Sequence, residues 1–269
     1  MTARARRRPG ILMPGYFALV VFFLLFPIVI VIPISFVDAQ FLTFPPESYS
    51  LRWYRRYFTD PDFVDATLLS LGVAFAATTI ATVCGTLGAL ALTRARIFGK
   101  GVIYGLLLSP IIVPGIIFAL GLYVFFAELD LLGNGFALVM AHACLGLPFS
   151  ILIVSATLEH FDVTLERAAR VSGAGPIRTF FHITLPAIRP AVFAAAVFGF
   201  FISFDDLVLA LFVMGREYTL PVRIWQDLRF EIDPTVAAAA SLLIVLTSIG
   251  IAVGGMLQLQ ARKRLGGAP

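Results

Sequence analysis

The stretch TLERAARVSGAGPIRTFFHITLPAIRPA, residues 164–191, interrupts a chain that is otherwise almost continuously apolar. A first short helix is predicted over 164–171, ending at SGAG, where glycine can adopt the positive φ that stops a helix. Pro176 suits the first turn of a second helix, because its missing N–H has no intrahelical partner there. We expect that second helix to end before Pro186, since the residue preceding a proline is disfavoured in the α region. The stretch therefore predicts a polar pair of helices, the elbow.

The composition of the rest of the chain indicates a membrane protein. The 269 residues are 59% hydrophobic and only 13% charged, with a mean hydropathy of +0.95. A soluble domain carries roughly a quarter charged residues, so this chain is predicted to be integral to a membrane. A bilayer core about 30 Å thick needs ~20 apolar residues per helix. Six runs meet that length and predict an all-α membrane protein with six transmembrane helices: residues 11–36, 66–92, 102–127, 134–157, 190–213 and 236–257.

The basic residues set the expected orientation. RARRR at residues 4–8 precedes a first apolar run about twice as long as that of a signal peptide, so we expect a retained helix. If the N-terminus is cytoplasmic, fourteen of the twenty Lys and Arg residues lie inside. That positive-inside bias predicts a basic cytoplasmic tail at 1–10, a single six-helix domain over 11–269, and both termini in the cytoplasm. The elbow then lies in the cytoplasmic loop 158–189, between spans four and five.

Several function classes are disfavoured by the sequence. Cys84 and Cys144 fall inside predicted spans, where each is expected to be a small buried hydrophobe, and no Cys/His spacing suits a metal. The basic residues flank membrane spans, which indicates topology rather than nucleic-acid binding. Gly99 and Lys100 are followed by Gly101 and lack the upstream glycine of a phosphate-binding loop. We therefore expect no catalysis by this chain alone and no cofactor bound by it.

The composition of the elbow suits either docking or a solvated connector. Its small residues would let another protein approach closely, and its arginines surround them with positive charge. The small residues are Ala168, Ala169, Gly173 and Ala174, and the arginines are Arg167, Arg170 and Arg178. Basic cytoplasmic loops are common, so composition leaves both interpretations open.

The spacing within the elbow resembles the EAA loop of inner-membrane permease subunits of binding-protein-dependent ABC importers. In that signature, Glu-Ala-Ala is followed by Gly four residues after the second Ala, and by Leu-Pro twelve and thirteen residues after that Gly. The matching residues are Ala168, Ala169, Gly173, Leu185 and Pro186. One position departs from the signature: Arg167 stands in the place of the Glu, and Glu166 lies one residue earlier.

The resemblance extends over nearly the whole chain. Residues 109–122, 142–149, 203–215 and 219–225 are similar to parts of the spermidine/putrescine permease subfamily. The resemblance implies that the elbow is a coupling helix seated in a separate ATPase subunit. The implied coupling residues are Glu166, Arg167, Ala168, Ala169, Gly173, Ala174, Leu185 and Pro186.

The resemblance also implies a multi-pass protein of the bacterial inner membrane with several partners. These are a second permease subunit, two ATPase subunits that bind ATP and Mg²⁺, and an extracytoplasmic solute-binding protein. Polyamine importers use two different permease chains, so a heterodimer is expected. The implied solute is a polyamine or a similar small organic cation, with ferric iron, an opine or an amino-phosphonate as alternatives. A secondary transporter would need no ATPase, but such proteins commonly carry inverted repeats, and the two halves of this chain show no convincing repeat.

Two acidic residues within the fifth apolar run are the main candidates for a substrate path. Asp205 and Asp206 are expected towards its outer half, where ionisable side chains usually face a protein interior or a water-filled cavity. They could guide a cationic solute; alternatively, Ser203 could cap a restarted helix with Asp206 at its third position. Adjacent helical residues point about 100° apart, so both carboxylates cannot face one path squarely.

Trp53 and His142 complete the path candidates. Trp53 belongs to LRWYRRYF at residues 51–58, an expected short amphipathic helix on the outer side. Its indole is interpreted as an interfacial anchor or, alternatively, as a contact for the outer gate or the solute-binding protein. His142 lies in the fourth run, where a lone histidine more often satisfies a neighbouring polar group than serves as a base.

Overall fold

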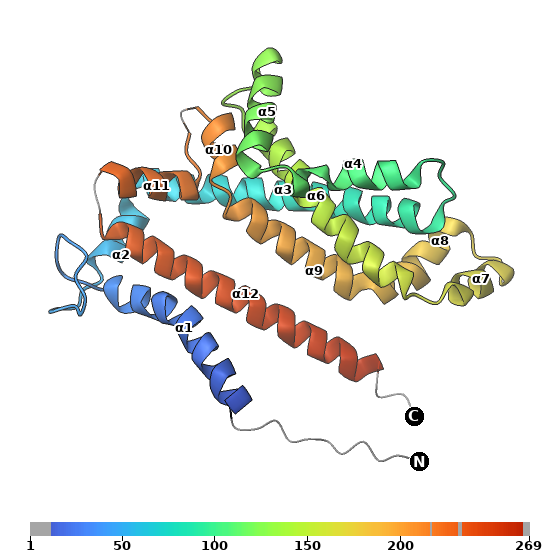
Figure 1. Ribbon diagram of the computed structural model, residues 1–269, viewed down its shortest axis with the longest axis horizontal. Helices are drawn as coiled ribbons and strands as arrows, with labels where there is room; N and C mark the ends of the chain where they lie inside the picture. Colours follow the sequence, from blue (N-terminus) through green and yellow to red (C-terminus); the bar gives the residue numbers. More distant parts are fainter. Residues whose placement is uncertain (1–11, 216, 231–232, 266–269) are drawn as a thin grey trace. The chain divides into compact units, whose positions relative to one another are not determined.

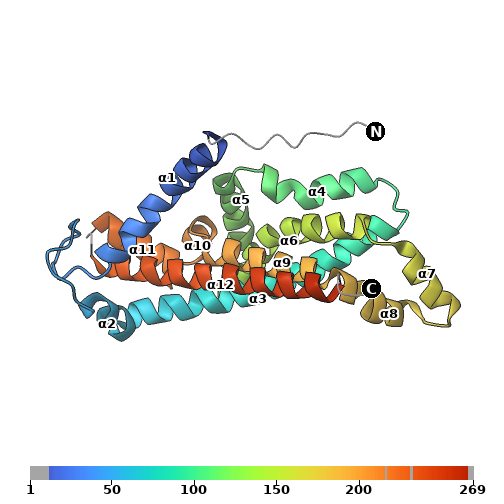
Figure 2. The same ribbon diagram turned by 90° about the horizontal axis from the view of Figure 1, so that it is seen from below.

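The protein is described by a computed structural model over residues 12–215, 217–230 and 233–265 (Figures 1 and 2). Helices make up most of these residues. Within the described ranges no strand is found, and one isolated antiparallel bridge joins Val37 and Tyr49. The basic tail predicted at residues 1–10 lies outside the described residues.

Two compact units divide the chain, and each has its own structure. The first comprises residues 1–60 with 226–246, and the second comprises residues 61–225 with 247–269. In the first unit, α1 (Leu12–Ile34) fills the first predicted span. Its described side chains are mostly apolar and exposed, as expected for a helix that is hydrophobic all round and meets lipid.

The short helix α2 (Arg52–Thr59) of the first unit is the predicted amphipathic helix. Trp53 and Tyr57 are its buried residues. Trp53 packs against Val37 and Ala238 in a small hydrophobic cluster. This burial supplies the tertiary contact that a helix of eight residues needs, because isolated helices of that length are marginal.

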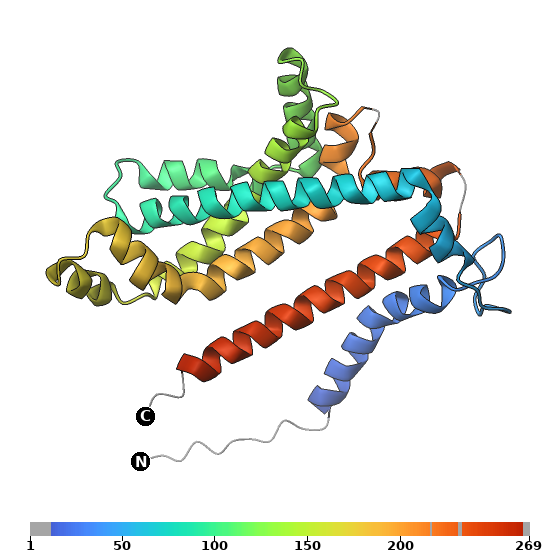
Figure 3. The same ribbon diagram turned by 180° about the vertical axis from the view of Figure 1, so that it is seen from behind.

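Three long helices form the bundle of the second unit: α3 (Pro61–Arg94), α6 (Gly135–Glu159) and α9 (Leu185–Phe204). Figure 3 shows α3 running along the unit, and α6 and α9 pack against it. A Cβ added at Gly85 of α3 would lie only 2.4 Å from the Cβ of Ser150 on α6. Membrane helices commonly pack through such small residues, because lipid supplies no hydrophobic drive between them. The second and fourth predicted spans are thus confirmed as helices.

The two cysteines differ from the prediction. Cys84 and Cys144 are free and exposed, on faces of α3 and α6 that the rest of the chain leaves uncovered. A thiol on the outer face of a membrane helix still meets an apolar environment. Hydrophobic surroundings therefore do not require burial inside the chain.

The third predicted span is wrong as one continuous helix. Residues 102–127 are divided between α4 (Lys100–Ile112) and α5 (Gly115–Glu128), which are bent by 104° relative to each other. Pro114 explains the break, because it lacks a backbone N–H and disfavours the α region for the residue before it. Val113 accordingly has φ −72° and ψ 131°, an extended conformation.

The fifth predicted span, 190–213, is also interrupted. α9 ends at Phe204, and α10 (Val208–Val213) follows after a short break. The chain then forms α11 (Leu220–Phe230) and α12 (Thr235–Leu265), and α12 covers the sixth predicted run. The apolar part of α12 among the described residues is Thr235–Gly250.

The elbow consists of α7 (Val163–Val171), α8 (Pro176–Thr179) and the turn between them, at one end of the second unit (Figure 1). Gly173 has a φ of +86°, as predicted for a residue that ends the first helix. Gly175 differs from the prediction: its φ is −67°, which any residue can adopt. Pro176 occupies the first turn of α8, as predicted.

The second elbow helix does not end before Pro186, contrary to the prediction. α8 continues through the π-helical segment η1 (Phe180–Thr184) into α9, so that Pro176–Phe204 is one helical path. A π turn bonds each carbonyl to an N–H five residues on, which widens the helix directly ahead of the proline ring. Leu185 consequently remains helical, at φ −60° and ψ −44°.

Length and composition identify the helices that can cross a membrane. Among the described residues there are four, or five if α4 and α5 are counted as one bent span. The four are Met13–Ile34, Pro61–Arg94, Gly135–Glu159 and Pro176–Phe204. The prediction of a helical protein with several membrane spans is confirmed.

Replacement of Gly173 tests the turn of the elbow. A side chain at φ +86° is strained by about 1–2 kcal/mol, although no atom of the chain lies within 4 Å of an added Cβ. We expect Gly173→Val to loosen the elbow and to speed trypsin cleavage at the exposed Arg167 and Arg170. Gly175→Val is the matched control, because Gly175 has an ordinary φ and the same open space. Equal cleavage rates for the two variants would contradict the strain.

Candidate functional site

The first helix of the elbow starts from a side-chain cap. Asp162 Oδ1 accepts a hydrogen bond from the backbone N–H of Thr164 at 2.9 Å and another from the Thr164 hydroxyl. These bonds, above all that from the hydroxyl, hold the pKa of the Asp162 carboxyl below its ordinary value. Because the folded pKa is lowered, the cap is fully formed at neutral pH and is lost only as the pH falls through that lowered value.

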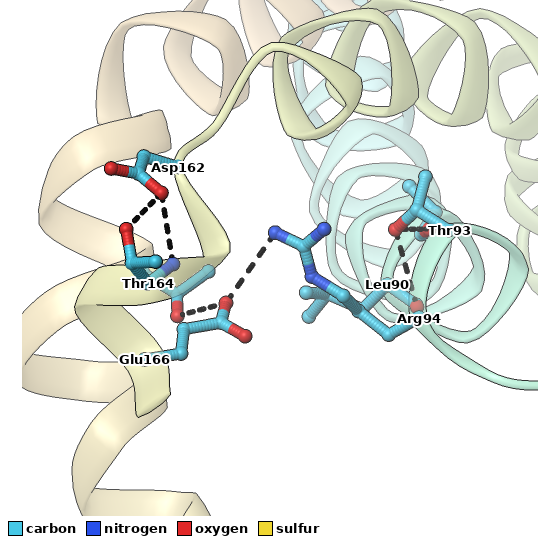
Figure 4. A network of polar contacts seen from close by, with 8 residues as sticks. Leu90, Thr93, Arg94, Asp162, Thr164 and Glu166 are labelled. Atoms are coloured by element: carbon cyan, nitrogen blue, oxygen red, sulfur yellow. Dashed lines mark hydrogen bonds and ion pairs between the residues drawn. The ribbon is translucent and has the colours of Figure 1, made fainter. Parts of the chain in front are cut away.

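Glu166 is the one described α7 residue that the fold buries, with 7% of its surface exposed. Its Oε1 accepts a hydrogen bond from Thr184 Oγ1 at 2.9 Å and lies 3.5 Å from Nη2 of Arg94. Figure 4 shows the Arg94 guanidinium reaching from α3 towards this carboxylate. The carboxylate of this predicted coupling residue therefore points into the protein and is held by α3 and η1.

The outer face of the elbow carries most of the other predicted coupling residues. Arg167, Ala168, Arg170, Gly173 and Arg178 are exposed, and Ala169 and Ala174 are half-buried. Val171 of α7 is an apolar side chain that is 90% exposed, and Ile177 of α8, 73% exposed, lines the groove between the elbow and α3. Small, apolar and positively charged side chains of the elbow are thus left uncovered by this chain.

The last two predicted coupling residues lie elsewhere. Leu185 and Pro186 are half-buried at the start of α9. Leu185 packs against the cluster that contains Leu158 and Ile188. These two residues shape the path of the helix from the elbow into the bundle.

The break between α9 and α10 brings three of the predicted path residues together. Ser203 lies in the last turn of α9, and its Oγ is 2.7 Å from Nδ1 of His142 on α6. Asp206 Oδ1 accepts a hydrogen bond from the backbone N–H of Leu209 at 2.7 Å and so caps α10. The cap expected from Ser203 is therefore supplied by Asp206, because the serine hydroxyl is engaged by the neighbouring helix.

The two aspartates have different surroundings, although both lie in the break and not on a helix as the sequence predicts. Asp205 is exposed, whereas the side chain of Asp206 is only 17% exposed. Asp206 Oδ1 lies 3.8 Å from Nε2 of His142, beyond hydrogen-bond distance. Ser203 and His142 are both buried. This serine, histidine and aspartate hence lack the hydrogen-bonded geometry and access of a catalytic triad, and they join α6 to the break.

Trp53 is a packing residue of the first unit. It is 7% exposed, and its Nε1–H donates to the carbonyl oxygen of Val37 at 2.9 Å. The guanidinium of Arg52 lies 4.3 Å from the centre of its ring, a cation–π contact. The indole is therefore buried and holds α2 to the segment after α1, and its role as an interfacial anchor, or as a contact for the outer gate or the solute-binding protein, stays a prediction.

No metal centre is found in the part of the chain that the structure describes. No group of three or more His, Cys, Asp or Glu side chains there could hold an ion. His142 and Asp206 instead bond to protein groups.

Sequence reasoning missed Arg94 and Thr184. In the sequence Arg94 is only one of the basic residues whose distribution indicates topology, and Thr184 has no charge or spacing that marks it. The opposite charges of Arg94 and Glu166 are a signal, but 72 positions separate them in the chain. The contact is visible only once the fold brings the end of α3 beside α7.

Permease subunits of known transport systems are similar to the chain over nearly its full length. It is 32% identical to the spermidine/putrescine transport system permease protein PotC of Shigella flexneri, over 94% of this chain and 96% of that protein. It is 34% identical to the PotC protein of Haemophilus influenzae, over 90% of this chain and 93% of that protein. It is 31% identical to the putrescine transport system permease protein PotI of Escherichia coli K12, over 90% and 89%.

Solved structures share the fold at lower identity. A chain of a bacterial ABC transporter involved in the import of the acidic polysaccharide alginate matches with a TM-score of 0.68 and 18% identity, over 97% of this chain and 98% of that chain. A chain of the MetNI methionine ABC transporter matches with a TM-score of 0.58 and 20% identity, over 72% and 93%. The family described as binding-protein-dependent transport system inner membrane component matches residues 81–263, which include the elbow and the α9–α10 break. The chain therefore belongs to the family of inner membrane components of binding-protein-dependent transport systems.

Proposed function

We propose that this chain is the permease subunit of an ATP-driven, binding-protein-dependent importer, and that its elbow is the contact for an ATPase subunit. One observation carries the proposal. The elbow leaves small, apolar and basic side chains uncovered, while its buried carboxylate is held inward by the chain itself. A solvated connector needs neither the exposed apolar side chain of Val171 nor a buried ion pair. Membership of the inner-membrane component family supports the same function.

In the proposed topology the chain crosses the membrane six times, with both termini and the elbow in the cytoplasm. α1, α3, α6 and the helical path Pro176–Phe204 are each long and apolar enough to cross. The bent pair α4–α5 and the helix α12 supply the remaining two crossings. The excess of Lys and Arg in the cytoplasmic segments, fourteen of twenty, supports this orientation.

The proposed assembly contains a second permease subunit, two ATPase subunits and an extracytoplasmic solute-binding protein. One six-helix bundle has too few helices for a gated path with an ATPase under each half, so a second permease chain is required. A different chain is favoured as that partner, giving a heterodimer. ATP and Mg²⁺ are assigned to the ATPase subunits, because this sequence has no phosphate-binding loop. One structural neighbour is an ABC transporter in complex with a periplasmic protein.

The proposed solute is a polyamine such as spermidine or putrescine. Relatives over 90% or more of the chain carry these solutes in their names. Asp205 is an exposed carboxylate beside a helix break, where its charge can attract a cation. Asp206 caps α10 and Ser203 is engaged by His142, so Asp205 is the path-lining member of this group.

Crowding the outer face of the elbow tests the ATPase contact. Ala168 is exposed on α7, so Ala168→Trp should leave this chain folded but block close approach of an ATPase subunit. We expect co-expressed ATPase subunits to co-purify about tenfold less well, since an overpacked contact costs 1–3 kcal/mol. Ala127→Trp on α5 is the control, an exposed alanine away from the elbow. Undiminished recovery with Ala168→Trp would overturn the assignment.

Reporter fusions test the orientation. A fluorescent reporter that matures only in the cytoplasm should be active after residue 265 and when inserted near Pro176. A phosphatase reporter that is active only outside should work near Glu47 and near Glu217. These outcomes follow from the distribution of basic residues. External activity at Pro176 would contradict the orientation and, with it, the ATPase contact.

Removing the charge of Asp205 tests the solute. In the reconstituted complex with its binding protein, spermidine or putrescine should stimulate ATP hydrolysis. Asp205→Asn should raise the concentration for half-maximal stimulation by about tenfold, because a carboxylate guides a cation through its charge. Glu159→Gln, which neutralises an exposed carboxylate at the end of α6, is the control. Stimulation by ferric iron, an opine or an amino-phosphonate, and none by polyamines, would contradict the proposed solute.

A further inference from the structure

The buried carboxylate of Glu166 contacts two distant parts of the chain through a single oxygen. Removing a carboxylate from water is unfavourable unless a positive charge and hydrogen-bond donors replace the water. Here Glu166 Oε1 has Arg94 Nη2 at 3.5 Å and the Thr184 hydroxyl at 2.9 Å. Arg94 is the last residue of α3, and Thr184 is the last residue of η1, directly before α9. One atom of the elbow is therefore joined to the ends of two long helices.

The hydroxyl of Thr184 is used differently from those of neighbouring threonines. Thr93 on α3 and Thr179 on α8 each donate to a backbone carbonyl four residues earlier in their own helix. Such a bond serves only the helix that makes it. Thr184 donates instead to Glu166, which lies 18 positions away on another helix. This hydrogen bond connects α7 to the start of α9. Thr184 lies in a π-helical turn, a feature that often marks a functional position.

Apolar side chains fill only part of the space between the elbow and α3. The contact between Glu166 and Arg94 is therefore a main attachment of the elbow to α3. A groove of about 590 Å³, open to the surface, lies there, and its lining includes Leu90 of α3, Ile177 of α8 and the polar residues Arg94 and Glu166. Arg94 also lies over the ring of Phe161, 5.5 Å from its centre, just before α7 begins. Arg94 thus holds the entrance of α7 and its buried carboxylate together.

We propose that Glu166, Arg94 and Thr184 form the joint that transmits displacement of the elbow to α3 and α9 at the same time. This inference rests on the proposed function, in which an ATPase subunit moves the elbow. The three residues are positioning residues: Glu166 of the elbow meets Arg94 of α3 and Thr184 of η1 inside the chain, and the ATPase contact is assigned to other, exposed residues of the elbow. Displacement of α7 moves Glu166, which carries the end of α3 and the start of α9 with it. α9 then passes the movement to the break at Asp205.

A pair of matched threonine variants tests this joint without requiring the solute. Both native cysteines are replaced by alanine, and Asp205→Cys reports the far end of α9 through its rate of labelling by a water-soluble thiol reagent. In the importer with its ATPase subunits, ATP with vanadate should change that rate. Thr184→Val should reduce the nucleotide-dependent change by about five- to tenfold, as expected for loss of one buried hydrogen bond. Recovery of ATPase subunits should be unchanged.

Two further variants act as controls for the threonine test. Thr184→Ser keeps the hydroxyl and should restore the nucleotide response, which loss of packing alone would not explain. Thr93→Val removes a hydroxyl that bonds only to its own helix and should behave as the unmodified chain. A full response with Thr184→Val would overturn the joint, and so would loss of ATPase subunits with that variant, since the residue would then support docking. If ATPase subunits do not co-purify even with the unmodified chain, the proposed function is overturned together with the joint. That outcome is distinguishable from failure of the joint alone, in which the unmodified chain still recovers the ATPase subunits.

The ion pair provides an independent test through a double-mutant cycle. Arg94→Gln and Glu166→Gln should each weaken the nucleotide response, and the double variant should be no weaker than either single variant, because both remove the same contact. Recovery of ATPase subunits again serves as the check on assembly. Additive losses would show that the two residues act separately and would overturn the joint.

Discussion

A carboxylate withdrawn from water needs a counter-charge or a hydrogen-bond donor, and the arrangement of the elbow depends on how Glu166 obtains both. Arg94 and Thr184 approach the same oxygen from two helices, at 3.5 and 2.9 Å. Because Glu166 faces inward, Ala168, about 200° away around α7, faces outward. One buried contact thereby fixes both the inner attachment of the elbow and the residues that its outer face offers to a partner.

The second unit also contains breaks in membrane helices, and each has a chemical cause. A span that stops within lipid must satisfy its free backbone groups inside the protein. Pro114 removes a donor at the bend between α4 and α5 and so lowers that requirement. At the α9–α10 break, Asp206 accepts a backbone N–H, and Ser203 of α9 hydrogen-bonds to His142 of α6. The break beside the exposed Asp205 is therefore a supported structure in which a charged side chain can be placed.

The sequence predicted features that depend on local backbone chemistry and failed for those that depend on distant partners. Gly173 and Pro176 follow from the rules for ending and starting helices, and both were predicted. The helix through Pro186 was not, because a π turn relieves the clash that proline normally causes. The inward direction of Glu166 was not predictable either, since its partner Arg94 is 72 positions away. The apolar runs were found by composition, but their interruptions depend on single proline and aspartate residues.

The central claim is that the elbow and the end of α3 move as one body when ATP binds to the assembled importer. This claim is tested by the distance between two spin labels, one at Val171→Cys on α7 and one at Leu68→Cys on α3. Both sites are exposed, and Leu68 lies about 40 Å from Arg94 along α3. The predicted distance is the same with and without nucleotide, within about 2 Å, and becomes nucleotide-dependent when Glu166→Ala removes the contact. A nucleotide-dependent change larger than that in the chain with intact Glu166, Arg94 and Thr184 would contradict the claim.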